Sequence, residues 1–166
     1  AHACASMHDE HGRVTVPGFY DAVKPPQNWE REELGKLPIT EYAYAQFLGV
    51  PEFFSPPGYS PLEAIRFCPT LEFNGIGGGY QGEGSKTVIP AEAFAKITCR
   101  LVPDQSAEDI AGKVKNSLQN AFPSAVRVDV QVKGGGDPYV ILPPGKHGAD
   151  ENSKPLLQRA FPLAEQ

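Results

Sequence analysis

The chain has 166 residues, a formal charge of −5 and three widely spaced cysteines. Its length suffices for one domain with a hydrophobic core, the negative charge without a basic run argues against nucleic acid as a partner, and no apolar stretch reaches the roughly 20 residues that a membrane span needs. The odd number of cysteines predicts neither a disulfide framework nor a zinc knuckle, so a reducing, cytoplasmic setting is the default expectation.

The N-terminal part of the chain predicts short elements separated by prolines. Residues 1–7 are expected to form the last turns of a helix, and 13–16 a short strand that Pro17 and Gly18 turn. Residues 24–68 form an irregular insertion rich in proline and aromatic residues. Three helices are predicted within it, at residues 28–37, 39–49 (N-cap Thr40) and 60–67 (N-cap Ser60, with Pro61 at the first position). An insertion of this kind inside a compact domain is often functional.

The second half of the chain predicts a sheet. Strands are expected at residues 70–76, 91–102, 126–133 and 139–142, and a terminal helix from Ser153. In residues 91–102, small and apolar side chains alternate with polar ones, so Cys99 is expected in the core and Arg100 on the outward face. In residues 126–133 the four valines are expected to point inward.

One helix is predicted between the second and third of these strands. Ser106 is expected to cap it, with Asp109 placed for a capping box. Its apolar stripe consists of Ile110, Val114, Leu118 and Phe122, at the spacing that packs a helix on a sheet. Antiparallel strands with one buried face and helices on that face make the fold class α+β, a two-layer sandwich.

The glycine-rich stretch GGGYQGEGSKTVIP, residues 77–90, is similar to a phosphate-binding loop in its letters only. Ser85 separates Gly84 from Lys86, where the Walker pattern requires glycine and lysine side by side. A strand follows the stretch, and the helix N-terminus that binds phosphate is therefore missing. The sequence argues against a nucleotide site.

Two other places carry residues with chemistry. His8, Asp9, Glu10 and His11 are metal-ligand types in a row, but a metal site needs three or four converging ligands, so a solvated helix end is the favoured interpretation. Arg100, on a rigid strand, could take a carboxylate in a bidentate fork or could be an ordinary surface charge.

Residues 69–105 resemble the lid, or dimerisation, domain of the di-zinc metallopeptidases of family twenty, which include carnosine dipeptidases, aminoacylases, glutamate carboxypeptidases and succinyl-diaminopimelate desuccinylase. The resemblance is greatest to the dipeptidase branch, in which N-G-I-x-G-G-Y-x-G-E-G-x-K-T-V-I-P leads to a strand ending R-L-V-P. In this chain these letters run from Asn74 to Pro90 and from Arg100 to Pro103. Weaker similarity extends in both directions.

The resemblance implies a ferredoxin-like, four-stranded antiparallel sheet with two main helices on one face, its first strand preceding this chain. It also implies a homodimer formed through the lid sheet edge. Thr87 would lie near the scissile carbonyl oxygen and Arg100 would grip the substrate carboxylate, both in the partner subunit's active site. Asn74, Gly82 and Gly84 would shape the ligand-facing backbone. Two zinc ions would bind in the parent's catalytic domain and none in this chain, which alone would be inactive.

The sequence thus predicts a lid domain at residues 1–144, with its insertion at about 24–68, and a return segment with a helix at 145–166. The parent would be a cytoplasmic zinc-dependent hydrolase of small peptides or N-acyl amino acids. The alternative is a stand-alone ferredoxin-like interaction module without an enzymatic parent. Peptidase and acylase activity, and the substrate side chain, stay open.

Overall fold

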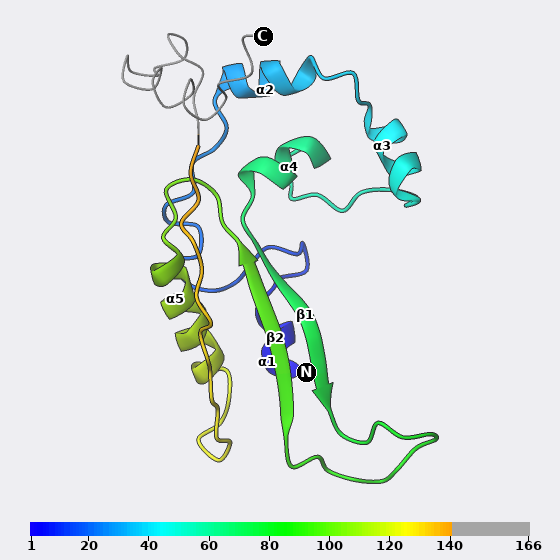
Figure 1. The fold of residues 1–166 in the computed structure, drawn as a ribbon, viewed down its shortest axis with the longest axis vertical. Helices are drawn as coiled ribbons and strands as arrows, with labels where there is room; N and C mark the ends of the chain where they lie inside the picture. The colour runs from blue at the N-terminus through cyan, green and yellow to red at the C-terminus, as the bar shows by residue number, and fades with distance from the viewer. Residues whose placement is uncertain (141–166) are drawn as a thin grey trace, which may run out of the picture.

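The structure, a computed structural model, describes residues 1–140 (Figure 1). Its elements in chain order are α1 (His2–Ala5), α2 (Asn28–Gly35), α3 (Glu41–Leu48), α4 (Pro61–Phe67), β1 (Thr70–Gly78), β2 (Ala93–Arg100) and α5 (Ala107–Asn120). Figure 1 shows a long hairpin with α5 beside it and with α2, α3 and α4 gathered at one end. The α+β class predicted from the sequence is confirmed.

The two strands form one antiparallel hairpin. Its register runs from Thr70 opposite Arg100 to Gly78 opposite Ala93, with a bulge between Phe73 and Gly75. Each strand therefore has one edge that pairs with no other strand among residues 1–140.

The core lies between this hairpin, α5 and the N-terminal segment. Leu71 on β1 is fully buried, and Phe19, before the insertion, is 1% exposed. The cluster comprises Met7, Val14, Val16, Phe19, Leu71, Ile110 and Val114. The apolar stripe predicted for the helix is confirmed at Ile110, Val114 and Leu118. Phe122 lies beyond the end of α5 and is 38% exposed, so that part of the prediction is wrong.

The helices of the insertion begin where their capping residues predict. The Thr40 hydroxyl accepts a hydrogen bond from the Ala43 amide at 3.1 Å. Ser60 and Glu63 form a reciprocal capping box at the start of α4, with Pro61 in the first turn. These signals involve atoms three residues apart, so they fix the helix starts without help from the rest of the fold.

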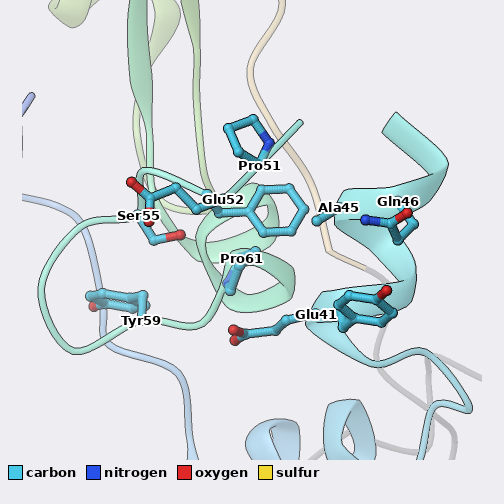
Figure 2. Close-up of a pocket in the computed structure, with 10 residues that line it drawn as sticks. Glu41, Ala45, Gln46, Pro51, Glu52, Ser55, Tyr59 and Pro61 are labelled. Carbon is cyan, nitrogen blue, oxygen red and sulfur yellow. The ribbon is translucent and has the colours of Figure 1, made fainter. Parts of the chain in front are cut away.

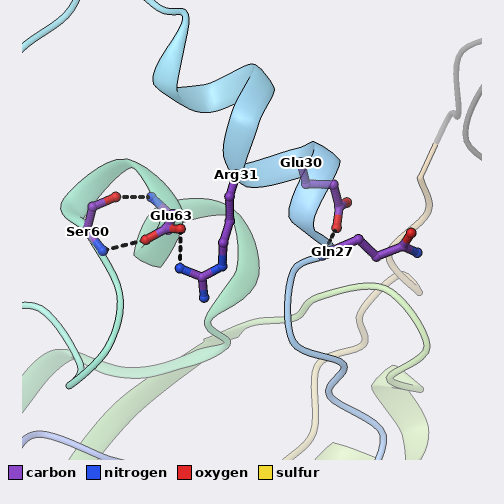
Figure 3. A network of polar contacts seen from close by, with 5 residues as sticks. All are labelled: Gln27, Glu30, Arg31, Ser60 and Glu63. Carbon is purple, nitrogen blue, oxygen red and sulfur yellow. Dashed lines mark hydrogen bonds and ion pairs between the residues drawn. The ribbon is translucent and has the colours of Figure 1, made fainter.

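A partly buried ion pair joins two of these helices. Arg31 on α2 contacts the Glu63 carboxylate on α4 at 2.6 Å (Figure 3). The other Glu63 oxygen accepts from the Ser60 amide at 2.7 Å, and the Glu63 side chain is only 11% exposed. A carboxylate so enclosed needs these partners, because an unpaired buried charge is costly.

Two predicted strands are absent among residues 1–140. Residues 13–16 contribute only one isolated bridge, between His8 and Val14. Residues 126–133 form no strand, and Val126 and Val132 are 46% and 56% exposed. Alternation decides which side chains share a face, but a strand also needs a neighbour's backbone at hydrogen-bonding distance.

Instead, the segment after α5 returns along that helix (Figure 1). The Asp137 carboxylate accepts from the Ala107 amide at 2.7 Å and so caps α5. The Ser106 side chain accepts no helix amide, and Asp109 pairs with Lys113 at 2.7 Å. The predicted capping box is therefore wrong, because a residue thirty positions away supplies the cap.

The end of the predicted sheet extends past the described residues. Tyr139 and Val140 are 83% and 56% exposed and form no strand. The remainder of the strand expected at 139–142, the return segment at 145–166 and the helix expected from Ser153 lie outside residues 1–140. The resemblance implies a ferredoxin-like sheet of four strands, and residues 1–140 form a sheet of two.

Candidate functional site

The loop that joins β1 to β2 carries Thr87. Every residue from 79 to 92 is exposed, and residues 85–90 form neither helix nor turn. Three contacts organise the loop from within. The Tyr80 hydroxyl donates to the Glu83 carbonyl at 3.3 Å, the Gln81 amide donates to the Gly78 carbonyl at 2.9 Å, and Lys86 lies 5.6 Å from the centre of the Tyr80 ring.

The two loop glycines singled out from the sequence have distinct reasons to be glycine. Gly84 has φ of +76°, a conformation that side chains of L-residues rarely adopt. A Cβ at Gly82 would collide with the Tyr80 hydroxyl group. Both positions therefore help the loop to bend at Tyr80 before the chain extends through Thr87.

A shallow hollow of about 270 Å³ lies on this loop. Its lining is Gly79, Tyr80, Lys86, Val88, Ile89, Pro90, Ala91 and Glu92. Three of these residues have polar groups: the Lys86 ammonium, the Glu92 carboxylate and the Tyr80 hydroxyl. The loop that carries Thr87 therefore has polar groups that could contact a small ligand or another protein surface.

Arg100 lies at the opposite end of the hairpin. Arg100 is exposed and lies opposite Thr70 on β1. Thr98, two residues earlier on the same strand, lies opposite Glu72. Among residues 1–140, no hydrogen bond or ion pair engages its guanidinium. A rigid strand thus presents an uncommitted bidentate donor.

The structure does not bring Thr87 and Arg100 together within one chain. Arg100 is seven positions beyond Ala93, which at about 3.3 Å per residue is roughly 23 Å, and Thr87 lies in the loop before Ala93. Asn74 sits between them, exposed at the bulge. Within one chain, most of the length of the hairpin therefore separates the two side chains that the resemblance assigns to one active site.

The run of metal-ligand types near the N-terminus forms a turn. Asp9 Oδ1 accepts from the backbone amides of His11 and Arg13 at 2.9 and 2.8 Å. The Arg13 amide is the main reason that the pKa of Asp9 lies below its usual value. Within the part of the chain that the structure describes, no group of three or more His, Cys, Asp or Glu side chains could hold a metal ion.

The half-buried cysteines are poor nucleophiles. Burial raises the pKa of the Cys68 and Cys99 thiols, so little thiolate exists near neutral pH. Cys99 packs against the core, as its position on the strand predicts.

A second hollow, of about 440 Å³, lies in the insertion and was not predicted (Figure 2). Its lining is Glu41, Tyr42, Ala45, Gln46, Pro51, Glu52, Phe53, Ser55, Tyr59 and Pro61. Figure 2 shows the Glu41 carboxylate extending from α3 toward Pro61 and Tyr59. The sequence signal for it is the density of aromatic residues and prolines. That signal does not predict a hollow, because its lining residues come from a helix and a loop that the tertiary fold brings together.

Comparison with known proteins places the fold and the site in context. The model of a family described as a peptidase dimerisation domain matches residues 1–126. The chain is 29% identical to the beta-Ala-His dipeptidase of Homo sapiens over 117 residues, which are 70% of this chain and 23% of that protein. It is also 29% identical to the Cys-Gly metallodipeptidase dug1 of Schizosaccharomyces pombe over 113 residues, 68% of this chain and 24% of that protein.

Solved structures agree with these relatives. An M20 family metallo-carboxypeptidase from Sulfolobus solfataricus matches with a TM-score of 0.60 and 36% identity, over 72% of this chain and 27% of that chain. Human carnosine dipeptidase 1 matches with a TM-score of 0.63 and 28% identity, over 72% of this chain and 26% of that chain. The chain spans about a quarter of the length of the curated relatives that it matches. It belongs to the peptidase dimerisation domain family, whose members here are parts of metallopeptidases.

Proposed function

We propose that this chain is the lid and dimerisation domain of a zinc-dependent dipeptidase, to which it contributes substrate-binding side chains but no catalytic residue. The observation that carries the proposal is the match of the dimerisation-domain model over residues 1–126. The names of the relatives, a beta-Ala-His dipeptidase and a Cys-Gly metallodipeptidase, favour a dipeptide substrate over an interaction module without an enzymatic parent. The chain alone would hydrolyse nothing.

Thr87 would act on the scissile amide. Its hydroxyl lies in an exposed loop at the tip of the hairpin, where it can enter a cleft on another protein surface. A hydroxyl that donates to the carbonyl oxygen as negative charge develops there lowers the barrier electrostatically. Asn74, Gly82 and Gly84 would shape the backbone around this group.

Arg100 would bind the carboxylate of the substrate. No described group engages its guanidinium, and the strand fixes its backbone. A bidentate contact between guanidinium and carboxylate orients the substrate as well as binding it.

The separation of these two residues favours a division of roles between subunits. An extended dipeptide spans about 7 Å, whereas Thr87 lies in the loop before Ala93, and Ala93 is roughly 23 Å along β2 from Arg100. One substrate therefore contacts Thr87 of one copy and Arg100 of the other. This revises the expectation that both residues act in trans from the same chain.

The dimer would form through a sheet edge. Both strands of the hairpin have an edge unpaired within residues 1–140, and such edges readily add strands of a second copy. The location of the protein is a separate question. No helix among residues 1–140 is long and apolar enough to cross a membrane, and a cytoplasmic location stays a prediction.

The zinc ions would bind outside this chain. The described residues offer no cluster of metal-ligand side chains, so they do not fit a di-zinc centre and no step of the reaction is assigned to them. Bound zinc would supply Lewis-acid chemistry in the remainder of the parent protein. The contribution of this chain is to position the substrate and to stabilise charge.

Arg100→Ala in the intact enzyme tests the proposal. For dipeptides with a free carboxylate we expect a higher KM and a kcat/KM lower by roughly ten- to a hundredfold, the usual value of a hydrogen bond to a charged group. Dipeptides with an amidated C-terminus should lose much less. Lys96→Ala, on the same face of β2, is the matched control. Unchanged kinetics on all free dipeptides would remove Arg100 from the site.

A further inference from the structure

The hollow of the insertion combines acidic and aromatic side chains (Figure 2). Its volume of about 440 Å³ lies in the range of small-molecule sites. Two carboxylates line it, those of Glu41 and Glu52, together with the rings of Tyr42, Phe53 and Tyr59. Within the part of the chain that the structure describes, no lysine, arginine or histidine lines it. The negative charge of the hollow is therefore not balanced by any of its lining residues.

The two carboxylates have no partner in the described part of the chain. Among residues 1–140, the side chains of Glu41 and Glu52 form no hydrogen bond or ion pair. The guanidinium of Arg31 lies 5.7 Å from the centre of the Tyr59 ring, but its charge is matched by the Glu63 carboxylate at 2.6 Å. Glu41 lies in the first turn of α3, where a negative charge favours the helix. Glu52 lies between α3 and α4, so helix stability does not account for it.

Local contacts hold the walls of the hollow in place. The Thr40 hydroxyl caps the start of α3, which carries one wall. The Phe53 ring stacks on the Tyr44 ring, with 5.2 Å between the ring centres and 28° between the ring planes. Pro51 and Pro61 restrict the backbone at two further points of the lining. A ligand would therefore meet side chains on ordered backbone, which lowers the entropic cost of binding.

We propose that this hollow binds an organic cation, an alkylammonium or guanidinium group such as the side chain of lysine or arginine. The faces of aromatic rings attract such cations, and carboxylates accept hydrogen bonds from their N–H groups. A metal ion is disfavoured, because no group of three or more His, Cys, Asp or Glu side chains among residues 1–140 could hold one. Glu41 and Glu52 would repel an anion, and a wholly apolar ligand would take water from both carboxylates without replacing it.

An NMR titration of the full-length protein with N-acetyl-lysine N-methylamide tests the proposal. We expect saturable binding with a Kd on the order of 1 mM, because a single side chain makes few contacts. N-acetyl-norleucine N-methylamide, which has the same carbon chain without the ammonium group, should not bind. Glu52→Gln should weaken binding of the lysine probe roughly tenfold or more. Glu108→Gln, at an exposed glutamate in the first turn of α5, is the matched control and should not change it.

Neither probe has a free carboxylate, so the contact proposed for Arg100 cannot account for binding of the lysine probe. Light scattering in the same titration identifies the source of the natural cation. If it is a small molecule, the mass of the protein stays constant as the probe binds. If it is a lysine or arginine of a second copy, the probe displaces that side chain and the mass falls. Both results support the cation site, whereas no saturable binding, equal binding of the two probes, or unchanged binding in Glu52→Gln overturns it.

Discussion

Gln105 joins two distant parts of the core by hydrogen bonds, and its replacement by methionine should be strongly destabilising. Its amide nitrogen donates to the Phe19 carbonyl at 2.8 Å, and its amide oxygen accepts from the Val102 amide at 2.9 Å. All three residues are buried, at 4%, 1% and 6% exposure. Methionine preserves the length of the side chain and removes both hydrogen bonds.

The loss of stability comes from two buried backbone groups, the Phe19 carbonyl and the Val102 amide, which no longer have a hydrogen-bond partner. Each buried group without a partner costs about 1–3 kcal/mol, so Gln105→Met, which leaves two such groups, should reduce the free energy of unfolding by about 2–6 kcal/mol. Urea denaturation followed by circular dichroism measures this difference. Gln131→Met is the control, because Gln131 bonds to Asp129 on the surface and should change stability by less than about 0.5 kcal/mol. A Gln105 variant as stable as this control would refute the bridging role.

Two further substitutions test the insertion and the hairpin. Arg31→Ala removes a partner of the largely buried Glu63 carboxylate and should cost about 1–3 kcal/mol; an unchanged urea midpoint would show that the pair is not needed. Gly78 has φ of +143°, and a Cβ there would lie 2.9 Å from the Ala93 Cα. Gly78→Ala should therefore cost about 1–3 kcal/mol, whereas Gly35→Ala, with no atom within 4 Å of the added carbon, should be neutral or stabilising by up to about 1 kcal/mol. Equal effects of the two glycine substitutions in urea denaturation would contradict this reasoning.

Features set by neighbouring residues were predictable from the sequence. The caps at Thr40 and Ser60 depend on atoms three positions away, and both helices begin where predicted. The apolar spacing of α5 likewise gave its buried face at Ile110 and Val114. The motif letters of residues 69–105 indicate the family that the model match over residues 1–126 shows.

Features that depend on distant residues were not predictable. Ser106 has the right identity and position for a cap, yet it is the Asp137 carboxylate that accepts the hydrogen bond from the Ala107 amide. Residues 126–133 alternate as a strand does, but they pair with no strand among residues 1–140. The separation of Thr87 and Arg100 follows from the length of the hairpin, because one residue lies in the connecting loop and the other at the far end of β2. The hollow of the insertion is formed by a helix and a loop that only the tertiary fold brings together.

The central claim is that each active site of the dimer takes Thr87 from one copy and Arg100 from the other. Mixing Thr87→Ala subunits with Arg100→Ala subunits, after dissociation and reassembly, tests it directly. Random pairing makes about half of the dimers mixed, and each mixed dimer of a symmetric pair would hold one fully intact site. The claim predicts recovery to about a quarter of unmodified activity, far above either variant alone. If both residues of a site came from the same copy, every site would lack one of them, and the absence of recovery would contradict the claim.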